Sequence, residues 1–361
     1  MASEGASQTG TSASAEAGRV LVCVRPPGWI NDRSGPLADL LGWARAAEAM
    51  GFDGVFVGDR LLGEATTDDK GVVYGASMID VTVALAAMAA VTSRILVGPL
   101  VYVFPYRHPI QVAKTFASLD ALSGGRVVLG AGLGWNEREF TSLGLRVSDR
   151  ASQFEEALPL VRRLWSGEPV SHAGDTWQFE DVRIAPRPAR QGGPPVWIAS
   201  FSPGHSLDWG GSFPPVARRQ LERVGRLANG WVPLVYTASH KRRLSSADMA
   251  AGWDLVLASA AAQGRTRTEI DFVYSDWVYV LDGPGARERC EAALGRFFSG
   301  TWEDALRTYT IGTADEVVEQ IREHTRLIDH VDAYVLTPFS DEVQQMQLLS
   351  GIADTLRGAS A

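Results

Sequence analysis

Cysteine is scarce in this sequence. Only Cys23 and Cys290 occur among 361 residues, which argues against a fold held by disulfide bonds. Such sparse usage is typical of a reducing compartment, and we expect a cytoplasmic protein. Spacings that hold metal ions, such as His-Glu-x-x-His or clustered Cys-x-x-Cys, are missing, and so is the Gly-x-Ser-x-Gly turn of serine hydrolases. The sequence therefore predicts neither a metal site nor a serine nucleophile.

Long apolar runs and an excess of positive charge are missing as well. The longest nearly continuous apolar stretch, residues 81–91, is too short to cross a bilayer. Residues 1–18 carry neither the basic start nor the apolar centre of a secretory signal, and we expect them to form a disordered tail. With 34 basic and 42 acidic residues the formal net charge is −8, which argues against a nucleic-acid partner.

Short apolar runs rich in β-branched residues alternate with longer helical patterns along the chain. Eight of these runs are predicted strands: residues 20–24, 53–58, 94–103, 126–132, 195–200, 230–236, 271–280 and 331–336. Because each run is apolar on both faces, the strands should form a parallel sheet covered by helices. Eight such units predict a closed (β/α)8 barrel, the TIM barrel, and an open doubly wound sheet is the alternative.

A single domain is predicted over residues 19–356, followed by a short tail at 357–361. Three segments exceed a minimal barrel, namely a predicted hairpin with a proline-rich exit at about 166–194 and loops at about 201–213 and 236–250. We place these insertions at the face formed by the carboxyl ends of the strands, where barrel enzymes build their sites. Long loops within a compact domain are usually functional or mobile, so we expect these loops to set specificity.

Three alternate glycines, Gly130, Gly132 and Gly134, follow one predicted strand and raise the question of what their backbone approaches. Small residues at this point are typical of barrel geometry. A dinucleotide-binding fingerprint would need a third glycine at position 135, which is Trp135, and an acidic residue that is missing here. The pattern argues against a Rossmann site. It leaves open a flat ligand over bare backbone, with Trp135 and Asn136 the first side chains able to touch it.

Several longer stretches together resemble the luciferase-like monooxygenase superfamily. They are GFDGVFVGDR (51–60), residues 89–144, 155–177 and 186–200, and RLANGWVP (226–233). Residues 94–140 carry the most specific part of this resemblance, which runs from about residue 20 to 235 and more loosely to 355. The resemblance implies a (β/α)8 barrel that binds reduced FMN, or the deazaflavin F420, at the carboxyl ends of its strands.

The function implied by the resemblance is oxygenation of a small organic substrate by reduced FMN and O2, through a flavin (hydro)peroxide. A separate reductase commonly supplies the reduced flavin in this family, and a homodimer is expected. The alternatives are hydride transfer with F420 and a flavin-binding barrel without turnover. Arg60 stands where F420-dependent members often carry histidine, and an arginine cannot act as a base, which favours FMN.

The resemblance also assigns individual residues to the cofactor. A non-proline cis peptide behind the flavin ring would be the bond between Leu100 and Val101. Trp135, Asn136 and Arg150 lie in the region that touches the flavin's pyrimidine edge, ribityl chain or phosphate in the family. Among them Asn136 can both donate and accept hydrogen bonds.

Most of these polar residues have structural alternatives. Asn136 suits a helix N-cap, with Glu139 completing a capping-box-like pair. Arg150 suits a solvated helix start. Asp59 and Arg60 are candidate catalytic residues, but they could form an ion pair with each other, or Arg60 could hold an anionic substrate.

A phosphate would fit the start of the helical pattern at 216–228. Ser212 is a candidate N-cap there and follows Gly211, so both are assigned to the phosphate, and Ser200 at the end of the fifth strand competes for this role. An acid or base for the substrate could come from His205 or His240, both in long loops. A dry pocket also needs apolar walls. The candidates for those walls are Trp29, Tyr102, Phe104, Trp135 and Trp209.

Overall fold

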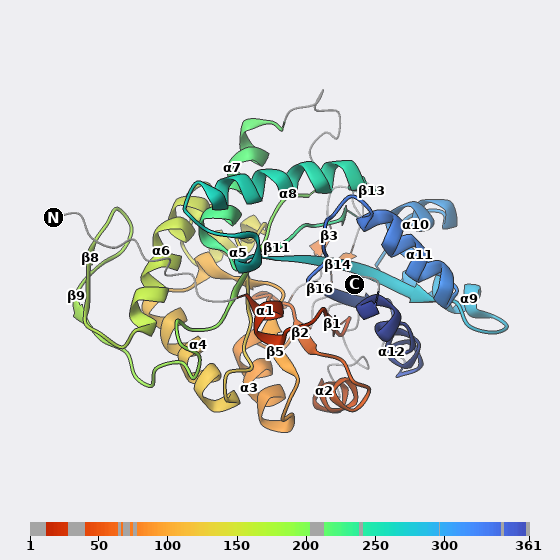
Figure 1. Ribbon diagram of the computed structural model, residues 1–361, viewed down its shortest axis with the longest axis horizontal. Helices are drawn as coiled ribbons and strands as arrows, with labels where there is room; N and C mark the ends of the chain where they lie inside the picture. Colours follow the sequence, from red (N-terminus) through yellow and green to blue (C-terminus); the bar gives the residue numbers. More distant parts are fainter. Residues whose placement is uncertain are drawn as a thin grey trace.

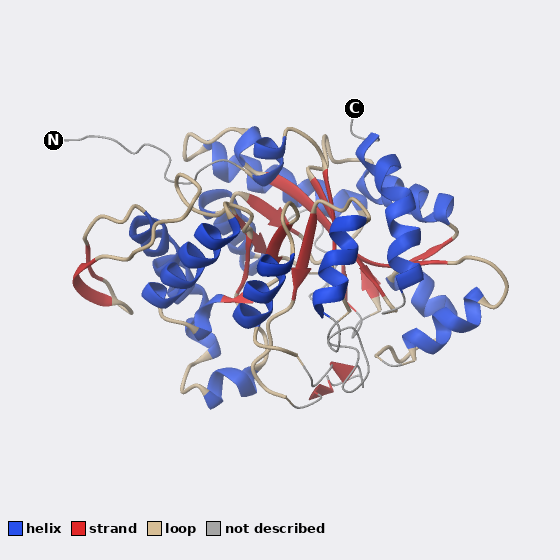
Figure 2. Ribbon diagram, turned by 90° about the horizontal axis from the view of Figure 1, so that it is seen from below, coloured by secondary structure: helices blue, strands red, loops and turns tan. Residues whose placement is uncertain are grey.

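The protein is seen here in a computed structural model that describes residues 12–27, 40–63, 66–67, 73–74, 78–202, 213–237, 241–295, 297–340 and 343–358. Parallel strands form a barrel at its centre (Figures 1 and 2). They are β1 (Leu21–Val24), β2 (Gly54–Val57), β5 (Leu96–Pro99) with β6 (Tyr102–Val103), β7 (Leu129–Gly132), β10 (Val196–Ala199), β11 (Gly230–Val232), β14 (Asp271–Val280) and β16 (Ala333–Pro338). All eight predicted strands are therefore present, and the predicted barrel is confirmed.

The order of the strands closes the sheet. Neighbours follow the order β5-β2-β1-β16-β14-β11-β10-β7-β6, and each pair of neighbours is parallel. β5 and β6 belong to one predicted strand, interrupted at residues 100–101. The pairing of β6 with β7 and a parallel bridge between Val97 and Val127 therefore complete the barrel.

Helices surround the barrel (Figure 1). The longer ones are α2 (Leu40–Ala49), α3 (Val81–Val91), α4 (Pro109–Ser123), α6 (Arg150–Trp165), α7 (Pro215–Leu227), α8 (Ser246–Ala261), α11 (Ala314–Thr325) and α12 (Val343–Gly358). Shorter ones are α1 (Ala13–Ala17), α5 (Glu137–Ser142), α9 (Ala286–Leu294) and α10 (Trp302–Thr308). No helix in the described part of the chain is long and apolar enough to cross a membrane.

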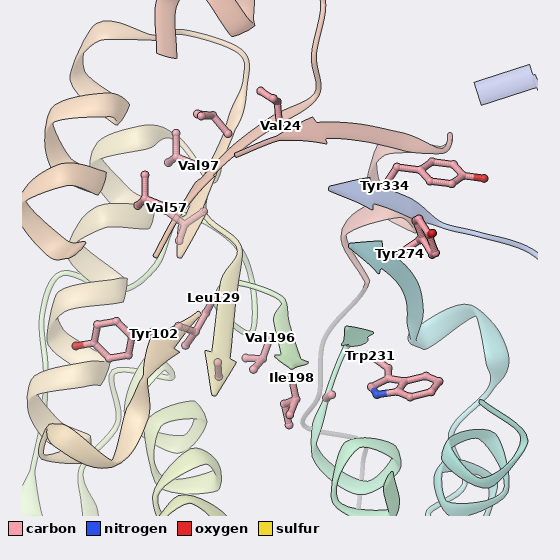
Figure 3. Packing of buried hydrophobic residues seen from close by; sticks show 14 of the residues in the cluster. Val24, Val57, Val97, Tyr102, Leu129, Val196, Ile198, Trp231, Tyr274 and Tyr334 are labelled. Carbon is pink, nitrogen blue, oxygen red and sulfur yellow. The ribbon is translucent and has the colours of Figure 1, made fainter. Parts of the chain in front are cut away.

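Apolar side chains fill both faces of the strands, as the unbroken apolar runs predict. The outer layer packs strand residues against the helices, and Figure 3 shows such side chains from all around the barrel, among them Val24, Leu129 and Tyr334. The inner layer fills the barrel itself with the alternate residues of the same strands, such as Cys23 and Val335. This alternation means that a residue's position along its strand tells which face it occupies.

Two of the three predicted insertions contain a hairpin, and the chain has two further insertions that the sequence did not predict. β8 (Val170–Ala173) and β9 (Gln178–Val182) form the predicted antiparallel hairpin, which projects beside α6 (Figure 1). β12 (Tyr236–Thr237) and β13 (Arg242–Arg243) form another, and β3 (Thr66–Thr67) pairs with β4 (Val73–Tyr74). Most of the loop at 201–213 lies outside the described residues. A longer excursion between β14 and β16 carries α9, α10 and β15 (Thr310–Gly312), which extends the sheet along the end of β14.

Residues 12–18, which the sequence assigns to a disordered tail, form α1 and its caps at the amino ends of the strands. Ala13 packs into the inner layer of the barrel, and its N–H donates to Asp271 Oδ2 at 3.0 Å. The Ser14 hydroxyl also donates to Asp271, which accepts a further bond from Trp197 Nε1 at 2.9 Å. These contacts close the end of the barrel opposite the expected site. At the other terminus α12 likewise extends into the predicted tail, to Gly358.

Candidate active site

Gly130 and Gly132 of β7, and Gly134 just after it, lie where this part of the chain meets the interrupted β5–β6 strand. A methyl group added to any of them would overlap this neighbour: 2.1 Å from Pro99 O for Gly130, 2.5 Å from Val101 Cγ2 for Gly132 and 2.6 Å from Val103 Cγ1 for Gly134. Gly134 also has a positive φ of 75°, which favours glycine. The glycines are therefore required by barrel geometry, the plainer of the two interpretations of the sequence.

The interruption itself falls at Leu100 and Val101. The peptide bond between them is cis, as the resemblance predicts. The Leu100 N–H donates to Val57 O at 2.7 Å, which keeps this segment attached to β2 although it lies between two separate strands. Both residues lie near the carboxyl ends of the strands, beside the last glycines of β7.

Asn136 begins α5 directly after the glycine strand. Its Oδ1 accepts from the Arg138 N–H at 3.1 Å, which confirms the predicted N-cap. Its Nδ2 is buried and has no hydrogen-bond partner among the described residues. Leaving a buried amide donor without a partner costs about 1–3 kcal/mol. A bound group with an acceptor at this position would recover that energy, so Asn136 suits both of its predicted roles.

The capping-box part of that prediction is wrong, because Glu139 turns away from Asn136. Its Oε1 accepts from the N–H groups of Leu61 and Leu62 at 2.9 and 3.0 Å, and its Oε2 accepts from the Tyr106 hydroxyl at 2.8 Å. Burial, with the neighbouring Glu139 carboxylate, raises the pKa of Tyr106 well above its usual range. Glu139 thereby ties α5 to the loop after β2.

The ion-pair partner of Asp59 is Arg107 rather than the predicted Arg60. The guanidinium contacts both carboxylate oxygens, one of them at 3.0 Å, and the Val103 N–H donates to Asp59 at 2.8 Å. Only 1% of the Asp59 side chain and 13% of the Arg107 side chain is exposed. Burial raises the pKa of Asp59, although Arg107 and the Val103 N–H oppose this. The pair holds the end of β2 to β6, which is a structural role for Asp59.

Three other residues that are predicted to contact the cofactor lie in surroundings that differ from one another. Trp135 is 59% exposed, an unusual state for so large an apolar side chain at the end of a strand. Arg150 begins α6 and donates from Nη1 to Val147 O at 2.6 Å. The Ser200 hydroxyl lies 3.5 Å from Gln220 O on α7. Trp135 and Asn136 are adjacent in the chain after β7, whereas Arg150 and Ser200 lie elsewhere and contact nearby backbone.

The remaining candidates divide between the core and the undescribed residues. His205, Gly211 and Ser212 lie outside the described residues, as do Trp29, Trp209 and His240. Tyr102 and Phe104 are almost fully buried, and the Tyr102 ring packs edge-on against Phe116 with centroids 5.0 Å apart. These two rings are part of the hydrophobic core. No group of acidic, histidine or cysteine side chains among the described residues could hold a metal ion.

Sequence reasoning missed Arg25, which follows β1 at the carboxyl ends of the strands. The signal was present as a single charge directly after an apolar strand, in VLVCVR at residues 20–25. Side chains alternate between the two faces along β1, so this arginine lies on the inner face of the barrel with Leu21 and Cys23.

A partly buried polar cluster joins β13, β14 and α11. His324 Nδ1 faces the Tyr274 hydroxyl at 2.9 Å and the Arg243 guanidinium at 3.3 Å, and its Nε2 contacts Leu244 O. Arg243 also pairs with Asp276. Burial and then the Arg243 charge lower the pKa of His324 to about 4. The neutral ring is therefore the form that the fold accommodates.

We expect His324 to make the fold sensitive to acid. Its folded pKa lies below the unfolded value of about 6.5, so between these values the unfolded chain binds more protons and stability falls as pH falls. The wild-type protein should lose unfolding free energy as the pH falls from 7.5 to 4.5. In His324→Gln this loss should be smaller by about 1–3 kcal/mol. Urea unfolding at four pH values measures this. His330→Gln, at a more exposed histidine, is the matched control, and equal pH slopes for all three proteins would contradict the prediction.

The comparisons with known proteins agree with the geometry. The sequence profile of the luciferase-like monooxygenase family matches residues 19–212. The chain belongs to this family.

Among curated relatives, the chain is 31% identical over 255 residues to 4-hydroxyprotoasukamycin monooxygenase from Streptomyces nodosus subsp. asukaensis, which covers 66% of each protein. It is 32% identical over 237 residues to the F420-dependent glucose-6-phosphate dehydrogenase of Microbacterium testaceum, covering 64% of this chain and 61% of that protein. The matches thus span about two thirds of these relatives' length or less. In fold it is similar to the monooxygenase RslO1 from Streptomyces bottropensis, with a TM-score of 0.74, 23% identity and coverage of 93% and 99%.

Proposed function

We propose that this protein is a flavin-dependent monooxygenase that uses reduced FMN and O2 to oxygenate a small organic substrate. The observation that carries the proposal is the buried, unpartnered Nδ2 of Asn136, next to the exposed ring of Trp135 at the end of the glycine strand. Membership of the family and the relative named as a monooxygenase support it. A separate reductase would supply the reduced flavin, and the protein would act as a homodimer.

The residues at this edge suit a flavin ring. The amide of Asn136 can donate to a carbonyl oxygen or ring nitrogen, and its Oδ1 stays engaged as the N-cap of α5. Trp135 offers an exposed aromatic face, and Leu100 and Val101 supply apolar side chains beside Gly130 and Gly132 of the preceding strand. When bound, reduced flavin would supply the electrons that activate O2. The protein's part is to orient the ring and exclude water, for which an apolar surround is required.

Hydride transfer with F420 is the second candidate, because one relative is named as an F420-dependent dehydrogenase. Arg60 argues against it. Its guanidinium stays protonated and cannot exchange a proton with a substrate, and its Nε donates to Leu62 O at 3.3 Å.

Anaerobic titrations with reduced FMN and with reduced F420 test the proposal, followed by mixing with O2 in a stopped-flow spectrophotometer. We expect reduced FMN to bind and to be oxidised by O2 more slowly than free reduced FMN. Asn136→Ser keeps an N-cap but lacks the amide donor, so it should weaken FMN binding about tenfold with little change in unfolding free energy. Binding of F420 alone would overturn the monooxygenase proposal, and unchanged FMN affinity in Asn136→Ser would overturn the role of Asn136.

A further inference from the structure

We propose that Arg25 and Thr337 form a binding site for the carboxylate of an anionic substrate with a flat apolar body. The inference rests on the proposed function, because it names the substrate class of that same site. It depends on three observations. The two side chains lie side by side, both lack hydrogen-bond partners within the described part of the chain, and several strands separate them from the residues proposed to bind the flavin.

Arg25 and Thr337 lie side by side on the inner face at the carboxyl ends of β1 and β16. These strands pair in parallel at Val24 and Leu336, and the Arg25 N–H donates to Leu336 O at 3.0 Å, so the next residue of each strand is a neighbour. Alternation places both side chains on the inner face of the barrel. Arg25 Nη2 also lies 3.3 Å from the position that a Cβ on Gly58 would take, so the side chain extends across the end of β2.

Both side chains lack the partners that buried polar groups normally have. Arg25 Nε is buried without a hydrogen-bond acceptor, and the structure records no ion pair for this guanidinium within the described residues. Thr337 Oγ1, in a residue only 1% exposed, is likewise without a partner there. Burial lowers the pKa of Arg25, but a guanidinium remains charged at any physiological pH. A partly buried cation beside an unpaired, buried hydroxyl is suited to an anion, and a carboxylate would accept from both.

The position around the barrel favours a substrate over the cofactor's phosphate. In the strand order, three strands lie between β1 and β10 in either direction, so Arg25 lies across the barrel from Ser200. Trp135 and Asn136 follow β7, the neighbour of β10. A flavin held at β7 and β10 would therefore leave room for the organic substrate at the carboxyl ends of β1 and β16.

Aromatic side chains next to this pair indicate the rest of the ligand. Trp277 is the partner of Thr337 in the pairing of β14 with β16. The Tyr236 ring packs against Trp277 with centroids 6.3 Å apart, and Tyr236 opposes the lowering of the Arg25 pKa by burial. Because Trp277 is itself buried in the core, the half-buried Tyr236 is the ring placed to contact a ligand, and a cation near it favours a small aromatic carboxylic acid.

Benzoate and benzamide, which have the same shape but differ in charge, test the inference by calorimetric titration of the full-length protein with and without reduced FMN. We expect the wild-type protein to prefer benzoate by at least tenfold. Arg25→Met should abolish this preference, and Thr337→Val should reduce it severalfold, while both keep their affinity for reduced FMN. Arg183→Met, at an exposed arginine after the β8–β9 hairpin, is the matched control and should behave as wild type. If Arg25→Met does not fold, Arg25→Lys should still lose part of the preference, because lysine lacks the planar fork.

The outcomes separate this inference from the proposed function. Equal binding of benzoate and benzamide to the wild-type protein, or a benzoate preference that survives Arg25→Met, would overturn the inference. Loss of reduced-FMN binding in Arg25→Met would assign Arg25 to the cofactor and overturn it too. If the wild-type protein failed to bind reduced FMN but still preferred benzoate through Arg25, the carboxylate site would stand and the proposed function would fall.

Discussion

Gly130→Ala should destabilise the protein by about 3 kcal/mol or more, and it is expected to sharply reduce the yield of folded protein. The new methyl would lie 2.1 Å from Pro99 O and 3.2 Å from Pro99 C. Both are backbone atoms, and Pro99 is held by its pairing with Val57 in the β2–β5 ladder, so the contact cannot be relieved by a side-chain rotation. Relief would require that two strands of a closed barrel move apart. Urea unfolding followed by circular dichroism measures the loss.

Gly351→Ala is the control for this prediction. Gly351 lies within α12, has no atom within 4 Å of the added methyl and has no positive φ. The same change there should be neutral or stabilise the protein by up to about 1 kcal/mol, because alanine is the better helix former. If Gly130→Ala were as stable as Gly351→Ala, the two strands would not approach as closely as described, and the glycines of β7 would need another explanation.

The barrel could be predicted from the sequence because its strands are buried on both faces. An unbroken apolar run such as VVLG at 127–130, followed by a helical pattern, has few interpretations other than a βα unit, and eight of them specify the architecture. α1 could not be predicted in the same way. Residues 12–18 are small and polar, a composition typical of a tail, and only the distant Asp271 gives Ser14 and the Ala13 N–H their partners. Contacts over such separations leave no local pattern.

The residues of the candidate site likewise differ in whether a local sequence pattern could predict them. Trp135 and Asn136 were found because they directly follow a predicted strand, where a local rule applies. Arg25 and Thr337 are neighbours only because the barrel closes by pairing its first strand, β1, with its last, β16, and nothing in the local pattern of either strand marks the two side chains as a pair. The sequence suggested an ion pair between Asp59 and the adjacent Arg60, whereas in the structure Asp59 pairs with Arg107. The sequence thus predicts which side chains follow each strand at the carboxyl end of the barrel. Which of these side chains contact one another depends on how the closed barrel places its strands.

Arg107→Met is expected to lower the unfolding free energy at pH 7 by about 3–5 kcal/mol, because it leaves the Asp59 carboxylate buried without a counterion. Methionine preserves much of the apolar volume over the Tyr102 ring, which the guanidinium carbon approaches to 4.2 Å. The pKa of Asp59, already raised by burial, should rise further once Arg107 no longer opposes it. A folded pKa above the unfolded value of about 3.9 means that stability falls as pH rises between the two. The deficit of the variant should therefore shrink as the pH is lowered from 7 to 5.

Two further variants make this prediction specific to the buried pair. Asp59→Asn combined with Arg107→Met removes both charges, so it should recover much of the lost stability and lose the added pH dependence. Arg146→Met breaks an ion pair with Asp149 in which the arginine side chain is 79% exposed, and it should change stability by less than about 1 kcal/mol. Urea unfolding at pH 5, 6 and 7 compares the four proteins. A loss in Arg107→Met as small as that in Arg146→Met would show that Asp59 does not need its counterion. The link between the end of β2 and β6 would then rest on the Val103 N–H bond to Asp59, while β6 stays paired with β7 on its other side.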